Sequence, residues 1–581
     1  MILNKGLFKP LLNFLIQIIP VFVLPALLSA QENPIISGRD RFSPIVAENG
    51  MVATQQAYGT KAGLQVLKEG GNAIDAAVTI GFTLAVTLPR AGNLGGGGFM
   101  LIYLADEKKV IAIDYREKAP QKATKDMFLD QSGNADPHLS RHSLLSVGVP
   151  GTVKGLTMAL EKYGTISLKR ALAPAIKLAE KGFIVDRSFS HSLKAVKPAM
   201  KLSPASLAIF YKKDGGDYQP GDRFVQNDLA STLKILSKEG PKAFYEGPIA
   251  EEMATFMSEK GGLITLEDMA VYRARLRKPI HGIYRGFDIY AMPPPSSGGI
   301  HIVQILNLLE AFPIRVLGHN TAETIHLMVE SMKLAYADRS QYLGDSDFVS
   351  VPVKGLISKK YADLLRAMID RKKARPSQEI RPNNPLPYES HETTHFSVMD
   401  QYGNAVSNTT TLNFSYGNKI VLPGTGILLN NQMDDFSAKS GVPNAYGLIG
   451  GTANAILAEK RMLSSMSPTI VMKSGKPFLA TGSPGGSRII TTTLQMIINV
   501  IDHQMNIAEA TNAVRIHHQW FPDELRIEEG LNQDTIRLLE NKGHRIITKN
   551  AMGSAQSIMQ VGRALHGASD PRTAGGLTAG H

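Results

Sequence analysis

The sequence contains no cysteine among its 581 residues. Disulfide bonds, thiolate nucleophiles and cysteine-bound metal ions are therefore excluded. Internal repeats, low-complexity tracts and a basic tail of the nucleic-acid-binding kind are absent too, although the net charge is +12. Because that charge is spread along the chain, it indicates solubility and attraction to anionic substrates. The composition, 43% hydrophobic and 20% charged, is that of a globular protein with one large or two medium domains.

Residues 1–30 have the layout of a secretory signal. Lys5 and Lys9 precede an apolar run from Leu11 to Leu28, and the small residue Ala30 stands before polar Gln31. The run is long enough for a membrane anchor, but it is interrupted by Gln17, Pro20 and Pro25. We therefore expect cleavage after residue 30 and export, to a Gram-negative periplasm or, as the alternative, to the medium.

The first part of the mature chain alternates between helical and strand-like patterns. Helical periodicity from Thr60 to Ala85 breaks at Gly70-Gly71, where Asn72 is placed to cap a second helix. A glycine run, Gly95 to Gly98, then leads into the strand-like stretch Leu101 to Leu104. The run lacks the G-K-[ST] ending of a phosphate loop and precedes a strand, so close backbone packing is the better interpretation.

Arginine and proline mark the ends of two further predicted strands. Arg116 stands just beyond the strand Val110 to Asp114, where its guanidinium is placed to bind a carboxylate or to form a surface ion pair with Glu117 or Asp114. A strand from Tyr284 to Met292 ends in the rigid loop Pro293 to Gly299.

A later helix begins with a capping box at Thr321. It has an apolar stripe that ends at Tyr336, and His326 beside that stripe is interpreted as a packing residue.

A linker and a hairpin meet near the middle of the chain. The stretch from about Asp370 to Glu392 is charged and rich in proline, which predicts a solvated, mobile linker. A β-prone run begins at Thr393, turns at Tyr402-Gly403-Asn404 and returns as a second strand. A threonine at such a border can attack the preceding carbonyl, cut the chain after Glu392 and use its freed α-amine, with a pKa near 8, as general base. The alternative is that Thr393 is simply a strand former.

The same junction also matches the H-E-x-x-H pattern of zinc proteases, from His391 to His395. That pattern requires a helix, which places both histidines on one face within reach of one metal ion. In a strand the two residues would lie about 13 Å apart, at about 3.3 Å per residue, and could not share a zinc ion. We therefore expect no metal here unless the segment is helical.

Polar stretches crowd the chain after Thr393. They offer amide and carboxylate acceptors for an ammonium, hydroxyl donors for a carboxylate, and a Gly-Gly pair whose N–H groups could hold an oxyanion. Together with two upstream motifs they closely resemble the γ-glutamyltranspeptidases, or glutathione hydrolases, of the N-terminal nucleophile class. The likeness runs from about Ile45 to the C-terminus, and its motifs are Arg116-Glu117, Pro293 to Gly299, Thr393-Thr394-His395, Asn430 to Phe436 and Gly482 to Arg488.

The resemblance implies an α/β fold of four layers, an αββα sandwich. It implies a precursor that cuts itself into a large subunit, residues 31–392, and a small catalytic subunit, residues 393–581, which stay together as a heterodimer. The expected activity is hydrolysis of the γ-glutamyl amide of glutathione and related compounds, or transfer of the γ-glutamyl group to amino acids and peptides. No cofactor or metal is implied.

The resemblance also assigns site residues. Thr393 would be the nucleophile, oriented by Thr411, and the N–H groups of Gly485 and Gly486 would hold the oxyanion. The substrate α-carboxylate would be bound by Arg116, Ser464 and Ser465, and its α-ammonium by Asn413, Gln432 and Asp435. A zwitterionic glutamyl head requires a cation and an anion placed apart, which agrees with this division.

Two positions depart from the family pattern or extend it. Glu392 stands where the bacterial relatives are expected to have glutamine, and because the bond attacked belongs to the backbone we expect processing to survive. Tyr446, within Gly441 to Gly447, resembles the closing residue of a lid loop, with an ordinary surface loop as the alternative.

Two other functions remain open. One is a cephalosporin or glutaryl acylase on the same scaffold, against which Gln432 and Asp435 argue because they suit a substrate with a free α-ammonium. The other is an exported protein that binds γ-glutamyl peptides without turnover, which would remain one uncut chain.

Overall fold

Two seven-stranded antiparallel sheets form the centre of the fold. In the computed structural model, which describes residues 41–386 and 397–581, the first sheet has the order β21-β2-β10-β11-β3-β4-β7. Its strands are β2 (Met51–Thr54), β3 (Gly97–Leu104), β4 (Lys109–Tyr115), β7 (Arg275–Arg277), β10 (Val398–Met399), β11 (Ala405–Thr411) and β21 (Leu577–Gly580). The second sheet has the order β1-β20-β19-β15-β14-β9-β8. Its strands are β1 (Ile45–Ala47), β8 (Ile280–Tyr284), β9 (Phe287–Ala291), β14 (Thr469–Lys473), β15 (Lys476–Thr481), β19 (Gln556–Val561) and β20 (Ala564–Ser569).

The central strand β3 is apolar on both faces, so the first sheet must be covered on both sides. In β3 the side chains of Met100 and Ile102 belong to one buried cluster, whereas those of Leu101 and Tyr103 belong to another that also contains Ile470 of the second sheet. Because successive side chains of a strand point to opposite faces, one face of the first sheet packs on helices and the other on the second sheet.

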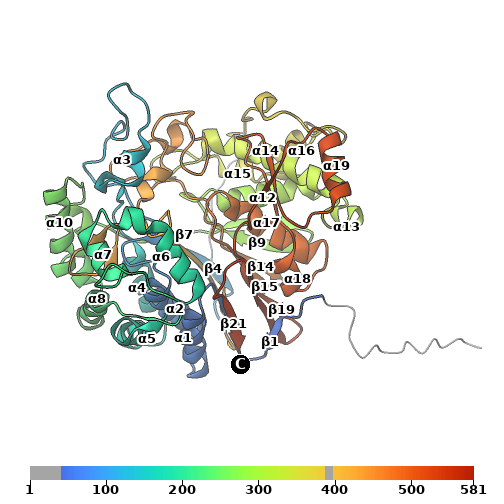
Figure 1. Cartoon of the computed structure of the whole chain (residues 1–581). Helices are drawn as coiled ribbons and strands as arrows, with labels where there is room; N and C mark the ends of the chain where they lie inside the picture. The colour runs from blue at the N-terminus through green and yellow to red at the C-terminus, as the bar shows by residue number, and fades with distance from the viewer. Residues whose placement is uncertain (1–40, 387–396) are drawn as a thin grey trace, which may run out of the picture. The chain divides into compact units, whose positions relative to one another are not determined.

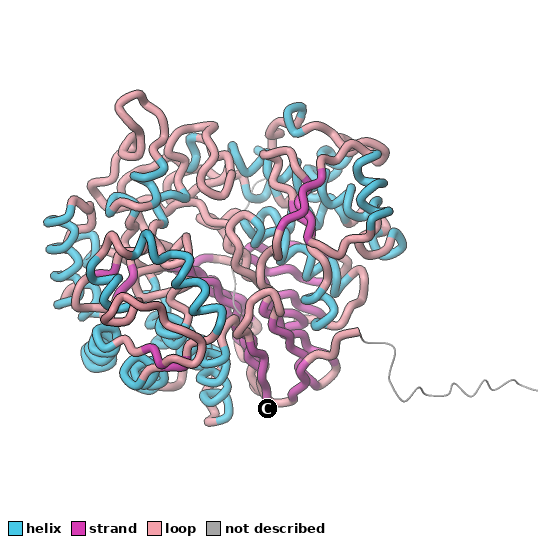
Figure 2. Tube along the Cα trace, in the orientation of Figure 1, coloured by secondary structure: helices cyan, strands magenta, loops and turns pink. Residues whose placement is uncertain are grey.

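Helices cover the outer face of each sheet (Figure 1). The first sheet is covered by α1 (Ala57–Lys68), α2 (Ala73–Thr87), α4 (Thr152–Tyr163), α5 (Leu168–Lys181), α6 (Arg187–Met200), α7 (Pro204–Phe210), α8 (Asn227–Glu239), α9 (Lys242–Tyr245), α10 (Pro248–Lys260) and α11 (Leu266–Ala270). The second is covered by α12 (Gly298–Leu309), α13 (Ile314–Leu317), α14 (Ala322–Tyr342), α15 (Val353–Leu356), α16 (Lys359–Arg366), α17 (Arg488–Ile501), α18 (Ile507–Asn512) and α19 (Gln533–Asn541). Figure 2 shows the strands between these two helical layers. The four-layer αββα sandwich is therefore confirmed.

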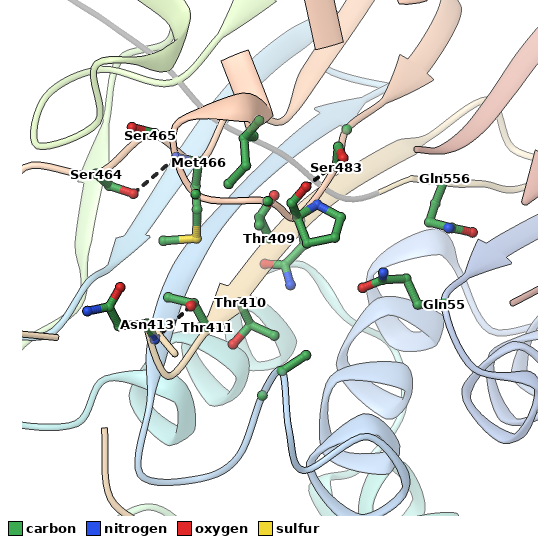
Figure 3. A pocket seen from close by; sticks show the side chains of 18 of the residues that line it. Gln55, Thr409, Thr410, Thr411, Asn413, Ser464, Ser465, Met466, Ser483 and Gln556 are labelled. Atoms are coloured by element: carbon green, nitrogen blue, oxygen red, sulfur yellow. Dashed lines mark hydrogen bonds between the residues drawn. The ribbon is translucent and has the colours of Figure 1, made fainter. Parts of the chain in front are cut away.

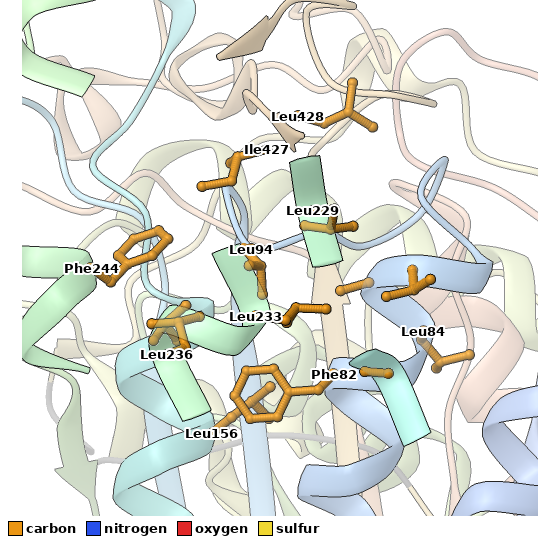
Figure 4. Packing of buried hydrophobic residues seen from close by; sticks show 14 of the residues in the cluster. Phe82, Leu84, Leu94, Leu156, Leu229, Leu233, Leu236, Phe244, Ile427 and Leu428 are labelled. Carbon is orange, nitrogen blue, oxygen red and sulfur yellow. The ribbon is translucent and has the colours of Figure 1, made fainter. Parts of the chain in front are cut away.

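Short elements lie outside the four layers. They are α3 (Pro137–Arg141) and the strand groups β5 (Phe183–Ile184) with β6 (Arg223–Phe224), β12 (Val421–Leu422) with β13 (Ile427–Leu428), and β16 (Ile516–His517) with β17 (Leu525–Glu528) and β18 (Ile546–Lys549). Figure 4 shows Ile427 and Leu428 of β13 near Leu94 and Leu229 in the helical core. Among the described residues, no helix is both long and apolar enough to cross a membrane.

Local predictions in the first part of the chain are confirmed. Asn72 caps α2, and its side chain accepts hydrogen bonds from the backbone N–H groups of Ile74 and Asp75, both at 2.9 Å. The glycine run packs closely, because a Cβ on Gly96 would lie 2.2 Å from the carbonyl oxygen of Thr411. The strand predicted at Leu101 to Leu104 is β3, which begins earlier, within the glycine run at Gly97.

The strand after the predicted cleavage junction lies inside the first sheet. Val398 of β10 pairs with Val52 of β2 on one side and with Val406 of β11 on the other. Glu392 and Thr393 themselves lie outside the described residues. Strands from both sides of the junction are therefore interleaved in one sheet.

The proline-rich segment before the junction is held against the protein over its described part. Ala374 donates a backbone hydrogen bond to the carbonyl of Lys542 at 2.7 Å. Buried Ser377 donates its backbone N–H to Asp523 at 2.8 Å and accepts the indole N–H of Trp520 at 2.9 Å. Composition suggested a solvated linker from Asp370 onward, but long-range contacts continue as far as Asn383, whose backbone N–H donates to Asp338 at 2.9 Å.

Candidate active site

A cavity of about 290 Å³ lies where strands of both sheets end. The end of β11 contributes Thr411, and the loop between β15 and α17 contributes Gly485 and Gly486. Figure 3 shows Thr411, Asn413, Ser464, Ser465 and Ser483 converging on this space from separate segments. All the predicted site residues that the structure describes line it: Arg116, Thr411, Asn413, Gln432, Asp435, Tyr446, Ser464, Ser465, Gly485 and Gly486. Ser397, four residues after Thr393 in the sequence, lines it too.

A buried ion pair forms the charged end of the cavity. Nη2 of Arg116 lies 2.5 Å from Oδ2 of Asp435, and the arginine side chain is fully buried. Burial raises the pKa of the Asp435 carboxyl, and the adjacent Arg116 guanidinium opposes this rise. The arginine does not form a surface ion pair, because its side chain has no contact with solvent.

Several buried polar atoms at this end have no hydrogen-bond partner within the described part of the chain, and two of them belong to the predicted site residues Arg116 and Gln432. One is the donor Nη1 of Arg116 and the other is the acceptor Oε1 of Gln432, whose Nε2 donates to Asp435 at 2.8 Å. An unpaired buried polar atom is costly, and a bound ligand, ion or water can satisfy it. A free donor on a cation and a free acceptor beside an anion are what the carboxylate and ammonium of an amino-acid head would satisfy.

The neighbour of Arg116 is a second buried carboxyl. Glu117 lies 3.7 Å from Nη1 of Arg116, and neither of its carboxyl oxygens has a hydrogen-bond partner among the described residues. Burial raises the pKa of Glu117 to about 7, despite the opposing charge of Arg116. Glu117 therefore gives the charged end of the site a group that titrates near neutral pH.

Asn413 is held in a left-handed backbone conformation, with φ of 74°. Its N–H donates to Oγ1 of Thr411 at 2.8 Å, and its side-chain amide donates to the carbonyl of Asn431 at 2.9 Å. The Thr411 oxygen thus accepts one hydrogen bond and keeps its own proton to donate. These contacts fix both side chains at the cavity wall.

Ser464 and Ser465 are positioned by the proline loop that precedes α12. The backbone N–H of Ser464 donates to the carbonyl of Pro295 at 2.7 Å, and its carbonyl accepts the N–H of Ser297 at 2.8 Å. Ser467 donates its hydroxyl to the carbonyl of Ser465 at 2.8 Å. The Pro293 to Gly299 motif therefore acts as a rigid support for the two serines.

The Gly485-Gly486 pair lies beneath Tyr446. Both glycines have positive φ, 135° and 61°, and a Cβ on Gly486 would meet the Tyr446 ring at 2.5 Å. Within the described residues neither glycine N–H donates a hydrogen bond, so both are available to an oxyanion. The Tyr446 hydroxyl donates to the carbonyl of Asn413 at 2.8 Å, so this side chain spans the site from the glycines to Asn413.

Sequence reasoning missed a further cation at the cavity. Arg339 of α14 lines it, and its Nε donates to the hydroxyl of Ser297 at 3.1 Å. Burial lowers the pKa of Arg339 to about 10. Arg339 lies three residues after Tyr336 and so shares its face of α14, but no motif in the sequence links that face to the cavity. Gln55 and Gln556 also line the cavity without any motif to indicate them.

The zinc-protease alternative concerns residues outside the described part of the chain. His391 and His395 belong to the segment 387–396, so the prediction that they bind no metal is not tested by the structure. The nucleophile prediction for Thr393 lies in the same segment.

Comparison with known proteins gives the family. Residues 59–580 match the family described as Gamma-glutamyltranspeptidase. The chain is 56% identical over 545 residues to the glutathione hydrolase proenzyme of Escherichia coli (strain K12), covering 93% of each protein. It is 39% identical to the Acylase ACY 1 proenzyme of Pseudomonas sp. (strain V22), covering 87% of this chain and 88% of that protein. The crystal structure of cephalosporin acylase from Bacillus halodurans superposes with a TM-score of 0.83 at 28% identity, covering 93% of this chain and 97% of that one. The chain belongs to the γ-glutamyltranspeptidase family of enzymes.

Proposed function

We propose that this protein is a self-cleaving γ-glutamyl hydrolase and transferase that acts on glutathione and related γ-glutamyl compounds. The observation that carries the proposal is the pair of unsatisfied atoms at the charged end of the cavity, Nη1 of Arg116 and Oε1 of Gln432. A glutamyl head satisfies both at once: its α-carboxylate binds Arg116, and its α-ammonium binds Gln432 and Asp435. The similarity to the Escherichia coli glutathione hydrolase proenzyme supports the same substrate and the same maturation.

Catalysis follows from a head fixed in this way. Ser464 and Ser465 add hydroxyl donors to the carboxylate, and the amide of Asn413 adds a contact to the ammonium. The γ-carbonyl carbon is then attacked by Oγ1 of Thr393, whose proton passes to the α-amine of the same residue. The N–H groups of Gly485 and Gly486 stabilise the negative oxygen of the tetrahedral intermediate.

The acyl-enzyme forms when that intermediate collapses. The C–N bond of the substrate breaks, the proton held on the α-amine moves to the leaving amine, and a γ-glutamyl ester of Thr393 remains. Water or the amino group of an amino acid or peptide then attacks the ester, and the α-amine again accepts and returns the proton. Hydrolysis and transfer differ only in this second nucleophile.

Maturation requires one cut, between Glu392 and Thr393. It releases the α-amine of Thr393 and divides the chain into a large subunit, residues 31–392, and a small subunit, residues 393–581, which remain paired as a heterodimer. The signal-like residues 1–30 support export, with the periplasm as the destination.

An acylase acting on cephalosporin or glutaryl substrates is the second candidate. It is favoured by the likeness to the Acylase ACY 1 proenzyme and to the Bacillus halodurans acylase structure. The two candidate functions differ in the role that they give Asp435. Its charge would have no ammonium to bind in a substrate that lacks an α-ammonium. Turnover of a γ-glutamyl anilide and a glutaryl anilide by the same preparation separates them.

Intact mass and N-terminal sequencing of the purified protein test the maturation. We expect two fragments from the native sequence, the smaller beginning Thr393-Thr394-His395, and one uncut chain from Thr393→Ala. Thr394→Ala is the matched control, because it changes the adjacent threonine and should still be cut. Glu392→Gln should also be cut, so a stalled native precursor that only this substitution releases would refute the expectation for Glu392. An uncut native chain would point to the binding protein instead.

A further inference from the structure

Three buried side chains far from the candidate active site place metal-binding atoms close together. His326 and Glu330 are four residues apart on α14, and His544 lies between α19 and β18. Their ligand atoms all lie within 4.8 Å of one another. α19 packs against α14. We propose that His326, Glu330 and His544 bind one divalent transition-metal ion, with Zn²⁺ the best match to two imidazoles and a carboxylate.

The hydrogen bonds of His326 leave the correct nitrogen free for a metal. Its Nε2 lies 2.7 Å from the carbonyl oxygen of Asp370, and a carbonyl only accepts, so Nε2 carries the proton. Nδ1 therefore presents a lone pair, and it faces Nε2 of His544 at 2.8 Å. An imidazole that donates its other N–H to a backbone carbonyl is the usual arrangement of a metal-binding histidine.

Metal binding requires only a small change at His544. Without metal, Nε2 of His544 donates its proton to Nδ1 of His326. With metal, that proton moves to Nδ1 of His544, both facing nitrogens become ligands, and each ring stays neutral. With Zn–N bonds of about 2.0 Å, two ligand atoms around a tetrahedral zinc ion lie about 3.3 Å apart. The two facing nitrogens are 2.8 Å apart without metal, so the rings would have to separate by roughly 0.5 Å.

The surrounding charges can accept a cation. Nζ of Lys333 lies 2.9 Å from Glu330 and 3.7 Å from Asp523, so two carboxylates face one ammonium. Asp523 also faces the His518 ring at 3.2 Å. The nearby Glu323 and Lys542 form their own pair at 3.2 Å and balance each other.

The carboxylate of Glu330 is held in place by its neighbours. Glu330 also accepts the backbone N–H of Arg375 at 3.3 Å, which orients its carboxylate. Because Lys333 competes for that carboxylate, the site is expected to exchange its metal.

The position of the site gives the metal a structural role. His326 and Glu330 lie before the predicted cleavage junction and His544 after it, so under the proposed function the ion would link the two subunits. It would also stabilise the anchored segment that begins at Asp370. An ion that binds only the folded state raises stability in proportion to the logarithm of its free concentration.

Titration of the untagged, chelator-treated protein with Co²⁺ and Zn²⁺ tests the proposal. We expect one saturable equivalent, a Co²⁺ visible spectrum typical of tetrahedral nitrogen and oxygen ligands, and a rise in Tm with Zn²⁺. His544→Gln should lose this equivalent and the Tm shift, while its turnover of a γ-glutamyl anilide stays at the native level because the site is remote from the cavity.

Two control variants test whether the metal binds at His391 or at His138 instead. His391→Gln removes the H-E-x-x-H match, and His138→Gln removes a histidine pair whose ring centroids are 6.0 Å apart, and both should retain the equivalent. Uncut Thr393→Ala protein should also bind the metal, which separates this test from that of the proposed function. Absence of saturable binding by the native protein, unchanged binding by His544→Gln, or loss in His391→Gln would overturn the proposal.

Discussion

Asp435→Asn separates recognition of the α-ammonium from the rest of the site. Asparagine has nearly the same shape as aspartate, and its oxygen can still accept hydrogen bonds from Arg116 and Gln432, which lie 2.5 Å and 2.8 Å from Oδ2. The negative charge opposite the substrate ammonium is lost. Any change in specificity therefore reports that charge rather than a change of shape.

The magnitude follows from the hydrogen bond that is weakened. A hydrogen bond to a charged group contributes about 1.5–3 kcal/mol, and every 1.4 kcal/mol is tenfold, so kcat/KM for a γ-glutamyl anilide should fall by about 10- to 150-fold. A glutaryl anilide has no ammonium and should lose less than about threefold. The ratio of the two values of kcat/KM is therefore the quantity to measure.

Asp434→Asn is the matched control. Asp434 is the adjacent acid, but it accepts hydrogen bonds from Ser140 at 2.6 Å and Arg141 at 3.2 Å and does not line the cavity. It should leave the ratio of the two substrates unchanged. If Asp435→Asn lowers both substrates equally, Asp435 only supports Arg116, and the assignment of the ammonium site is refuted.

Three further substitutions test other contacts of the site. Tyr446→Phe removes the hydrogen bond to the Asn413 carbonyl. Such a bond contributes about 0.5–1.5 kcal/mol, so KM should rise by about 2- to 10-fold. An unchanged KM in steady-state kinetics would show that this hydroxyl does not hold the site closed. Gly486→Ala adds a Cβ 2.5 Å from the Tyr446 ring at a φ of 61° and should lower kcat by about tenfold or more; native kcat would exclude tight packing there. Burial raises the pKa of Glu117 from its ordinary value of 4.5 to about 7. Between these two pH values the folded protein keeps a proton on Glu117 that the unfolded protein releases. The free energy of unfolding therefore falls as the pH rises through this range. Glu117→Gln should flatten that slope, worth roughly 3 kcal/mol, in urea unfolding at about pH 5 and about pH 8, and an unaltered slope would assign it to another group.

Much of the fold could be predicted because its signals are local. The break at Gly70-Gly71 and the cap at Asn72 place α1 and α2 within a few residues of their observed bounds. The turn at Tyr402 to Asn404 likewise appears as predicted, with Gly403 at a φ of 86°. Which strands become neighbours depends on contacts between distant residues, so the order of strands in the two sheets was not predicted, and only the four-layer arrangement came from the family resemblance.

The residues of the candidate site were predicted from sequence motifs. The residues that the sequence analysis missed belong to no recognised motif. Arg116 and Asp435 were assigned to one site only through the resemblance, and the cation and the anion were expected to lie apart. The structure instead joins the two residues, which are separated by 319 positions in the sequence, in a direct ion pair. Arg339 reaches the cavity because α14 packs beside the proline loop, which no local pattern records. The anchoring of Ser377 by Trp520 and Asp523 was missed for the same reason, because proline and charge indicate a linker but not what it packs against.

The interleaving of β10 between β2 and β11 has a consequence for reversibility. As an uncut chain, the protein can regain its sheets by a unimolecular reaction. After a cut before Thr393, the same strand pairs must form between two separate polypeptides, so refolding becomes second order and depends on concentration. Activation would therefore make recovery of the fold depend on protein concentration, and in dilute solution the lifetime of the active enzyme would be set by how slowly its interleaved strands separate.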